Sequence, residues 1–149
     1  DDGPWGTHVA TADHAAVPQV TFGDPEVASV GLNEMQAQKK GLSYRVGAVG
    51  NALINRNIAM RETRGFLKLL ASRDAPGKVL GLRVAGPEAS SCIQGIAFLI
   101  DQGACLEDID RCVHPHPAIT EGVQECARLM LGRSIHKPEV FGGTLLRCT

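Results

Sequence analysis

Short apolar-rich stretches bounded by glycine, proline and aspartate recur along the chain, and this pattern predicts β-strands. The expected strands cover residues 17–22, 44–50, 65–71 and 78–86, and a further short apolar segment at 27–32 leads to Asn33. The sequence SRDAPG between the last two strands has the Asp, Pro and Gly of a tight hairpin connection. Residues 51–64 join two of these strands, and their pattern assigns them no element.

The polar segment after Asn33 predicts a short helix over residues 34–40. Asn33 is a suitable N-cap, and Gly41 is a suitable stop. Met35 alone gives this helix little apolar face, so we expect it to lie on the surface of the domain.

A longer helix is expected over residues 86–103, with Pro87 in its first turn and Gly103 at its C-terminal end. One side carries an apolar stripe of Ile93, Ile96, Ala97 and Ile100, and the other side carries Phe98 and Leu99. A helix that is apolar nearly all round is buried, so it should lie between the sheet and a second surface.

The last part of the chain is helical up to the tail. Residues 106–110 predict a short helical turn, and residues 120–131 predict a helix with one apolar face made by Val123, Ala127, Met130 and Leu131. Strands followed by helices indicate an α+β fold, an antiparallel sheet with helices packed on one face. We divide the chain into a lead-in at 1–16, one domain at 17–136 and a tail at 137–149 without a clear period.

The composition is that of an ordinary soluble protein of 149 residues, with 44% apolar and 21% charged residues. The net charge is −1 and no basic tract stands out, which argues against a nucleic-acid partner. No apolar run reaches the ~20 residues that would span a membrane, and the polar start DDGPWGTH is not a signal peptide. Because the chain does not begin with Met, we expect it to be cut from a longer polypeptide.

The chain has five cysteines, an odd number, and no two of them are spaced as C-x-x-C. A disulfide framework is therefore not indicated, and most of these residues are expected to be buried in a protein of a reducing compartment. That compartment is the cytoplasm, or the mitochondrial matrix if the protein is eukaryotic.

The segment CVHPHPAITEG at 112–122 carries the main candidate chemistry. His116 has a side chain that exchanges protons near neutral pH, and Glu121 at the start of the last helix can orient it. Two other interpretations stay open from spacing alone: an ordinary turn followed by a capping glutamate, or a metal site in which Cys112, His114 and His116 share one face of an extended segment. Nothing nearby completes a metal ligand set.

Several binding motifs are missing from the chain. There is no G-x-G-x-x-G, no P-loop, no G-x-S-x-G and no redox C-x-x-C or C-x-x-x-x-C. An acid–base pair without a surrounding substrate or cofactor site is incomplete.

The segments VPQVTFGDPEVASVGLNEMQA, RETRGFLKLLA, GKVLGLRVAGPEAS and LIDQGACLEDIDRCVHPHPAITEG occur in an order that resembles a known family. It is the C-terminal dimerisation domain of the flavin-dependent pyridine nucleotide–disulfide oxidoreductases, and the dihydrolipoamide dehydrogenases within it are the most similar. The resemblance covers some 110–120 residues, about three quarters of the chain.

The resemblance implies a role for each residue of the H-x-H-P motif. It makes His116 the acid–base catalyst and Glu121 the group that orients it, and it puts His114 at a dimer interface. His116 and Pro117 would face the partner subunit's FAD. The family's threonine after the proline is Ala118 in this chain, which puts one supporting hydrogen bond in doubt.

The resemblance also implies what lies outside the chain. FAD, NAD(P) and the redox-active cysteine pair would sit in N-terminal domains, to which residues 1–16 would be the linker. The complete enzyme would be a homodimer acting on a small-molecule or protein-bound dithiol or disulfide, with no bound metal. The isolated chain would catalyse nothing by itself and would act as a homodimerisation module.

Two relatives are alternatives. Mercuric reductases resemble the chain at TRGF, but they typically have tyrosine at the catalytic position and a vicinal cysteine pair near the C-terminus, where this chain has His116 and the single Cys148. Glutathione-reductase-like enzymes share H-P-x-x-x-E and usually lack the first histidine, which is His114 here.

Overall fold

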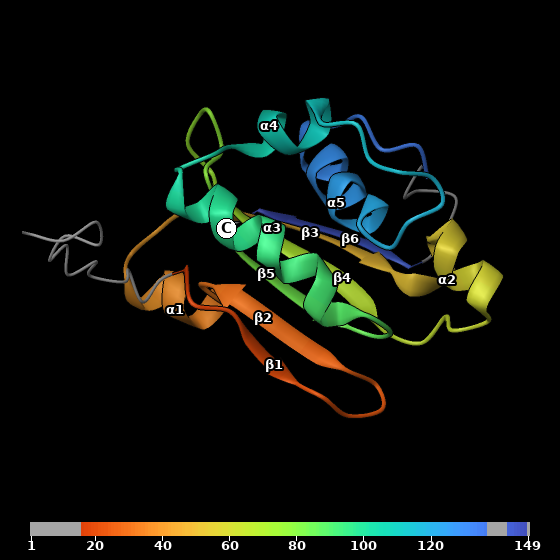
Figure 1. Ribbon diagram of the computed structural model, residues 1–149. Helices are drawn as coiled ribbons and strands as arrows, with labels where there is room; N and C mark the ends of the chain where they lie inside the picture. Colours follow the sequence, from red (N-terminus) through yellow and green to blue (C-terminus); the bar gives the residue numbers. More distant parts are fainter. Residues whose placement is uncertain (1–15, 137–142, 149) are drawn as a thin grey trace, which may run out of the picture.

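The computed structural model describes residues 16–136 and 143–148, and they form one antiparallel sheet with helices against it (Figure 1). The six strands lie in the order β1-β2-β5-β4-β3-β6. They are β1 (Gln19–Thr21), β2 (Val27–Gly31), β3 (Tyr44–Gly50), β4 (Phe66–Ser72), β5 (Val79–Ala85) and β6 (Thr144–Cys148). The helices are α1 (Glu34–Lys39), α2 (Asn55–Met60), α3 (Ala89–Asp101), α4 (Leu106–Arg111) and α5 (Glu121–Leu131), with a 3₁₀ turn at Asn51–Leu53.

The centre of the sheet is the hairpin of β4 and β5. Leu67 pairs with Val84 and Leu69 pairs with Leu82, and all four side chains are buried in one core cluster. Successive side chains in a strand alternate between faces. Lys68 and Arg83, which form the pair between these two, therefore point to the opposite face.

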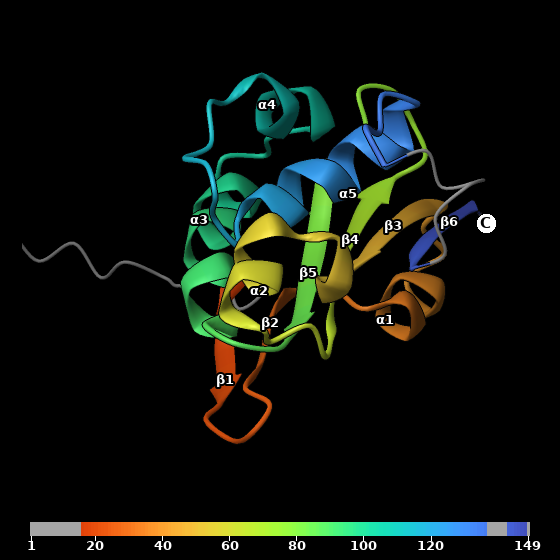
Figure 2. The same cartoon turned by 90° about the vertical axis from the view of Figure 1, so that its right-hand side faces the viewer.

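Helices α3 and α5 cover the face that carries Leu67 and Leu69. Figures 1 and 2 show both helices on the same side of the sheet, α3 over β2 and β5 and α5 over β3 and β4. The predicted α+β fold class, an antiparallel sheet with helices packed against it, is confirmed, although the short helix α1 lies on the other face. The apolar face predicted for the last helix is also confirmed, because Val123, Ala127 and Met130 are buried against the sheet.

The opposite face of the sheet carries a smaller cluster under α1. Ala37 of this helix is fully buried beside Tyr44, Val46 and Leu70. Met35 is 66% exposed, so the surface position predicted for this helix is confirmed. Asn33 caps the helix as expected, since its side chain accepts a hydrogen bond from Gln36 N at 2.8 Å.

Helix α3 differs from its prediction on one side. Ile93, Ile96 and Ala97 are buried, as the apolar stripe requires, but Phe98 is 64% exposed. The expected second surface is thus not supplied by the described part of this chain, and one side of α3 faces outward.

The structure adds elements where the sequence pattern predicted none. The unassigned segment 51–64 contains the 3₁₀ turn and α2, and part of the tail forms β6 along the edge of β3. Arg147 of β6 contacts the Glu34 carboxylate at 3.2 Å. The predicted lead-in at 1–16 lies almost wholly outside the described residues, as do residues 137–142 of the tail. Among residues 16–136 and 143–148, none of the helices combines the length and the hydrophobicity that a membrane span requires.

Candidate functional site

The site is a short loop between α4 and α5 that carries His116. The Nδ1 atom of His116 lies 2.8 Å from Glu121 Oε1, and the backbone N–H of Ala118 donates to Glu121 Oε2 at 2.8 Å. One carboxylate therefore holds both the imidazole and the backbone two residues beyond it. The His116–Pro117 peptide within this loop is cis.

Glu121 is the first residue of α5, where the partial positive charge of a helix N-terminus favours a carboxylate. Partial burial by itself would raise the pKa of Glu121, but the hydrogen bonds from Ala118 and His116 outweigh it. Together with the charges of His116 and His114, they hold the pKa of this carboxyl below its ordinary value. Glu121 is thus an anion at neutral pH, ready to accept from the ring of His116.

The His116 side chain is 62% exposed, while that of Glu121 is 27% exposed. The glutamate occupies Nδ1, which leaves Nε2 as the ring nitrogen that can exchange a proton with a reactant. An imidazole oriented by a carboxylate through one nitrogen and open at the other is the arrangement of a general acid–base catalyst.

His114 lies in a different environment from His116. It lines an open, mostly apolar groove of about 290 Å³ beside α3, together with Cys92, Ile96 and Leu99. Its Nε2 atom is buried without a hydrogen-bond partner in the described structure. Burial lowers the pKa of His114, against the opposing effects of a backbone hydrogen bond at Ile109 and of the Glu121 charge.

The three residues of the metal hypothesis do not come together as ligands. Cys112 lines the groove beside α3 with His114, whereas His116 lines a separate cavity next to α5. Within residues 16–136 and 143–148, no group of three His, Cys, Asp or Glu side chains is placed to hold a metal ion. All five cysteines are free, with Cys92 and Cys126 buried and Cys112 and Cys148 exposed.

The cavity next to His116 has a volume of about 150 Å³. It lies between α5 and the segment before α2, and its polar lining comes mainly from α5. Its walls are Leu53, Ile54, Asn55, His116, Glu121, Gln124, Glu125, Arg128, Ile135 and His136. The cavity is small, and both His116 and Glu121 line it.

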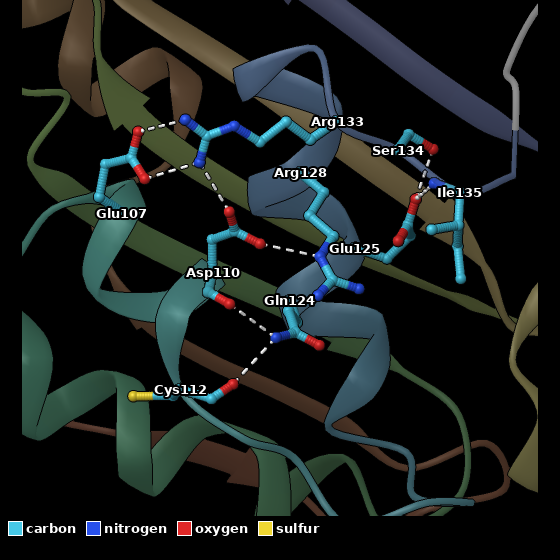
Figure 3. A network of polar contacts seen from close by, with 9 residues as sticks. All are labelled: Glu107, Asp110, Cys112, Gln124, Glu125, Arg128, Arg133, Ser134 and Ile135. Carbon is cyan, nitrogen blue, oxygen red and sulfur yellow. Dashed lines mark hydrogen bonds and ion pairs between the residues drawn. The ribbon is translucent and has the colours of Figure 1, made fainter.

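A network of polar contacts joins α4 to α5 beneath the loop (Figure 3). Gln124 Nε2 donates to the backbone carbonyls of Asp110 and Cys112, each at 2.9 Å. The Asp110 carboxylate accepts from Arg128 Nε and from Arg133 Nη1, both at 2.8 Å. The hydrogen bonds from Arg128 and then Arg133 hold the pKa of Asp110 below its ordinary value. Sequence reasoning missed this network, although Gln124 stands one helical turn after Glu121.

The turn after α5 is fastened by Glu125, a carboxylate that is only 3% exposed. It accepts hydrogen bonds from the Ser134 hydroxyl and from the backbone N–H of Ile135 (Figure 3). This turn brings Ile135 and His136 to the cavity beside His116.

The chain matches the model of one protein family over residues 17–127: pyridine nucleotide-disulphide oxidoreductase, dimerisation domain. It is 39% identical over 124 residues to a dihydrolipoyl dehydrogenase of Haloferax volcanii, covering 83% of this chain and 26% of the relative. A dihydrolipoyl dehydrogenase of Geobacillus stearothermophilus is 37% identical over 129 residues, covering 87% of this chain and 27% of the relative.

Solved structures show the same fold. LpdA of Mycobacterium tuberculosis matches with a TM-score of 0.76 at 23% identity, over 82% of this chain and 26% of that one. The HOCl-induced flavoprotein disulfide reductase RclA of Escherichia coli matches with a TM-score of 0.72 at 26% identity, over 76% of this chain and 26% of that one. The chain thus spans about a quarter of the length of the relatives it matches.

Proposed function

Because this chain belongs to the pyridine nucleotide-disulphide oxidoreductase dimerisation-domain family, we propose that it is the part of a flavin-dependent dithiol–disulfide oxidoreductase that supplies an acid–base pair. His116 is the proton acceptor and donor, and Glu121 orients it. The substrate class is a dithiol or its disulfide, either small or carried on a protein, as in the dihydrolipoamide dehydrogenases.

The observation that carries this proposal is the contact between Glu121 Oε1 and His116 Nδ1 at 2.8 Å. It fixes the tautomer, because a neutral ring that donates from Nδ1 accepts at Nε2. When Nε2 takes a proton, the carboxylate stabilises the imidazolium that results. Because the His116 side chain is 62% exposed, a reactant from outside the chain can reach it.

The proton transfer serves thiol–disulfide exchange. His116 Nε2 takes the proton from one substrate thiol, which has an ordinary pKa near ~8.5 and would otherwise be mostly protonated. The thiolate attacks one sulfur of an enzyme disulfide, and the other sulfur leaves as a thiolate. The second substrate sulfur, after losing its proton, then attacks the mixed disulfide. The substrate becomes a disulfide and the enzyme a dithiol, so two electrons have moved.

The enzyme disulfide, FAD and NAD(P) belong, in this proposal, to the roughly three quarters of the relatives' length that this chain does not span. Bound FAD would take the electron pair from the enzyme dithiol, and NAD(P)⁺ would receive it. The exposed ring of His116 and the neighbouring Pro117 are the part of this chain that would face those groups, which fits the outward position of the loop.

Self-association is the second part of the proposal: the enzyme disulfide that His116 serves belongs to the other subunit of a homodimer. The outward side of α3 has Phe98 at 64% exposure and borders the apolar groove that His114 lines. A second copy packed here would cover the groove and its apolar lining. Obligate interfaces of this kind bury roughly 2,000–5,000 Å².

The same geometry is compatible with the activities of two related enzyme classes. A glutathione-reductase-like enzyme would use the same pair on a different disulfide, and a mercuric-reductase-like enzyme would not need His116 as a base. In every one of these versions the 149-residue chain alone is a dimerisation module without turnover.

The test is the His116→Gln substitution in the full-length protein. General acid–base catalysis contributes about 10²–10⁴-fold, so oxidation of a dithiol at pH 7 should fall by that factor while FAD content and the dimer persist. Part of the loss should return as the pH rises toward ~8.5, because the substrate then supplies its own thiolate. Near-normal turnover of the variant at pH 7 would refute the role of His116.

A further inference from the structure

We propose that Gln124 is a positioning residue for the His116–Glu121 pair: its side-chain amide fastens the entry of the histidine segment, residues 112–118, to α5. The contacts within the chain carry this proposal by themselves. Its consequence for catalysis rests on the function proposed above.

The amide of Gln124 makes two hydrogen bonds at once. Both hydrogens of Nε2 are used, one on the Asp110 carbonyl and one on the Cys112 carbonyl, at 2.9 Å each. Gln124 is only 8% exposed, so water cannot readily replace these bonds. A two-point contact from a planar amide fixes both the position and the direction of the chain at Cys112.

These two carbonyls are groups that α4 leaves unsatisfied. The last carbonyls of a helix have no partner within it, and here α4 ends at Arg111 with Cys112 already in extended conformation. No glycine follows to turn the chain back. Gln124 thus closes the end of α4 from the neighbouring helix, at the point where the histidine segment starts.

The far end of the same segment is held by the same helix. Glu121 binds His116 and Ala118, and it precedes Gln124 by three residues, so the two side chains lie on one side of α5. Between the two anchored ends, Val113 is 98% exposed. The position of the imidazole is therefore set from both ends by one face of α5.

The helix that Gln124 holds is itself fixed. Arg128 and Arg133 bind the Asp110 carboxylate, and Arg133 also binds Glu107 at 2.7 Å and 3.0 Å (Figure 3). The backbone of Asp110 is bound by Gln124 and its side chain by the two arginines. Loosening Gln124 alone would therefore free Cys112 and the residues after it while α4 stays in place.

The chemical requirement at position 124 is a pair of donors. Gln124→Met has nearly the same length and removes both donors. Gln124→Glu has the same shape and turns a carboxylate oxygen toward the two carbonyls, which repels them. Gln124→Asn keeps the donors but is one carbon shorter, and it serves as the milder change if the first two variants fold poorly.

The experiment is an NMR titration of the Glu121 carboxyl carbon in the 149-residue chain, with an amide spectrum to show that each variant is folded. The pKa of Glu121 depends on its contacts with Ala118 and His116, which lie in the segment that Gln124 holds. We expect Gln124→Met to raise this pKa toward its ordinary value, since the hydrogen bonds that stabilise the charged carboxylate are then weakened.

The matched control is Gln38→Met, which removes an amide donor from α1, where Gln38 Nε2 donates to the Tyr44 hydroxyl at 2.9 Å. It should leave the pKa of Glu121 unchanged. The deciding variant is Gln124→Met, or Gln124→Asn if Gln124→Met does not fold. If the folded variant has the same Glu121 pKa as the unsubstituted chain, the proposal is wrong.

A kinetic measurement on the full-length protein separates this proposal from the function on which it builds. With His116 misplaced, Gln124→Met should lower kcat about tenfold or more with little change in KM, because small misplacements of a catalytic group are costly. An unchanged kcat would contradict the positioning role. If instead His116→Gln keeps full activity, the proposed function fails, while a shifted Glu121 pKa in Gln124→Met would still stand.

Discussion

The close approach of α5 to the sheet at Gly47 makes a sharp prediction for the Gly47→Ala variant. Gly47 lies on β3, opposite Leu69 of β4, on the face that α5 covers. A Cβ atom added there would lie 2.4 Å from the Cys126 carbonyl oxygen and 3.2 Å from the carbonyl carbon. Both are backbone atoms, so no side-chain rotation relieves the contact.

The size of the effect follows from that distance. Ordinary contacts of a Cβ begin near 3.4 Å, so α5 and β3 must separate by about 1 Å at this point. Overpacking of this kind costs about 1–3 kcal/mol, and replacing Gly by Ala recovers ~0.4–1 kcal/mol from the unfolded chain. We therefore expect a net loss of about 1–2 kcal/mol of unfolding free energy.

The assay is urea denaturation of the 149-residue chain followed by far-ultraviolet circular dichroism. The matched control is Gly23→Ala, whose added Cβ has its nearest neighbour, the Pro25 carbonyl oxygen, at an ordinary 3.5 Å. The control should lie within about 0.5 kcal/mol of the unsubstituted chain. A Gly47→Ala chain as stable as the control would refute the reasoning that α5 rests directly on the backbone of β3.

Three further outcomes are expected. The contacts of Glu121 lower its folded-state pKa, so this residue contributes stability that is present above the unfolded-state pKa of ~4.3 and is lost as the pH falls through the lower folded-state pKa. The unfolding free energies of Glu121→Gln and of the unsubstituted chain should therefore differ at pH 7 and converge as the pH falls below that folded-state pKa. Gly95 of α3 lines the apolar groove, and a Cβ atom added there would have no neighbour within 4 Å. The Gly95→Arg chain should therefore stay folded but be monomeric in analytical ultracentrifugation. A dimer of unchanged affinity would place the interface elsewhere. Burial raises the pKa of Cys92 and of Cys126 to about 12. At pH 8 a thiol reagent should therefore modify the exposed Cys148 in the folded chain, and Cys92 and Cys126 only after unfolding. Fast labelling of Cys92 or Cys126 in the folded chain would contradict their burial.

The fold was predictable from local pattern where burial follows a simple period. The inward face of α5 obeys such a period, and Val123, Ala127 and Met130 are buried as the pattern requires. The central strands were predictable from apolar stretches bounded by glycine, proline and aspartate, although their burial does not alternate simply. β6 was not predictable in this way, since TLLRC does not alternate and its strand conformation comes from pairing with β3. That pairing is a tertiary contact between segments about a hundred residues apart, which a local pattern does not contain.

The candidate site shows the same division. Spacing placed His116 near the start of α5, so a contact with Glu121 could be proposed from the sequence. The contacts of Gln124 and Glu125 could not be proposed from the sequence, because a polar residue on a surface helix is normally expected to face water. Both are buried, one under the end of α4 and the other under the turn at Ser134, and neither covering element is visible in the local sequence of α5.

The isolation of the histidine segment has a physical explanation in this account. A loop that exposes an imidazole held by Glu121 and an apolar Val113 suits a surface completed by another chain. The apolar groove beside α3 points to the same conclusion on the neighbouring surface.

We propose that His116 completes an active site whose disulfide belongs to the other subunit. It is tested most directly by mixing two inactive full-length proteins, one with His116→Gln and one without its redox-active cysteines. If His116 acts across the dimer, each mixed dimer regains one working site, and an equal mixture should reach about a quarter of wild-type activity after subunit exchange. A mixture that stays inactive although mixed dimers form would contradict the claim.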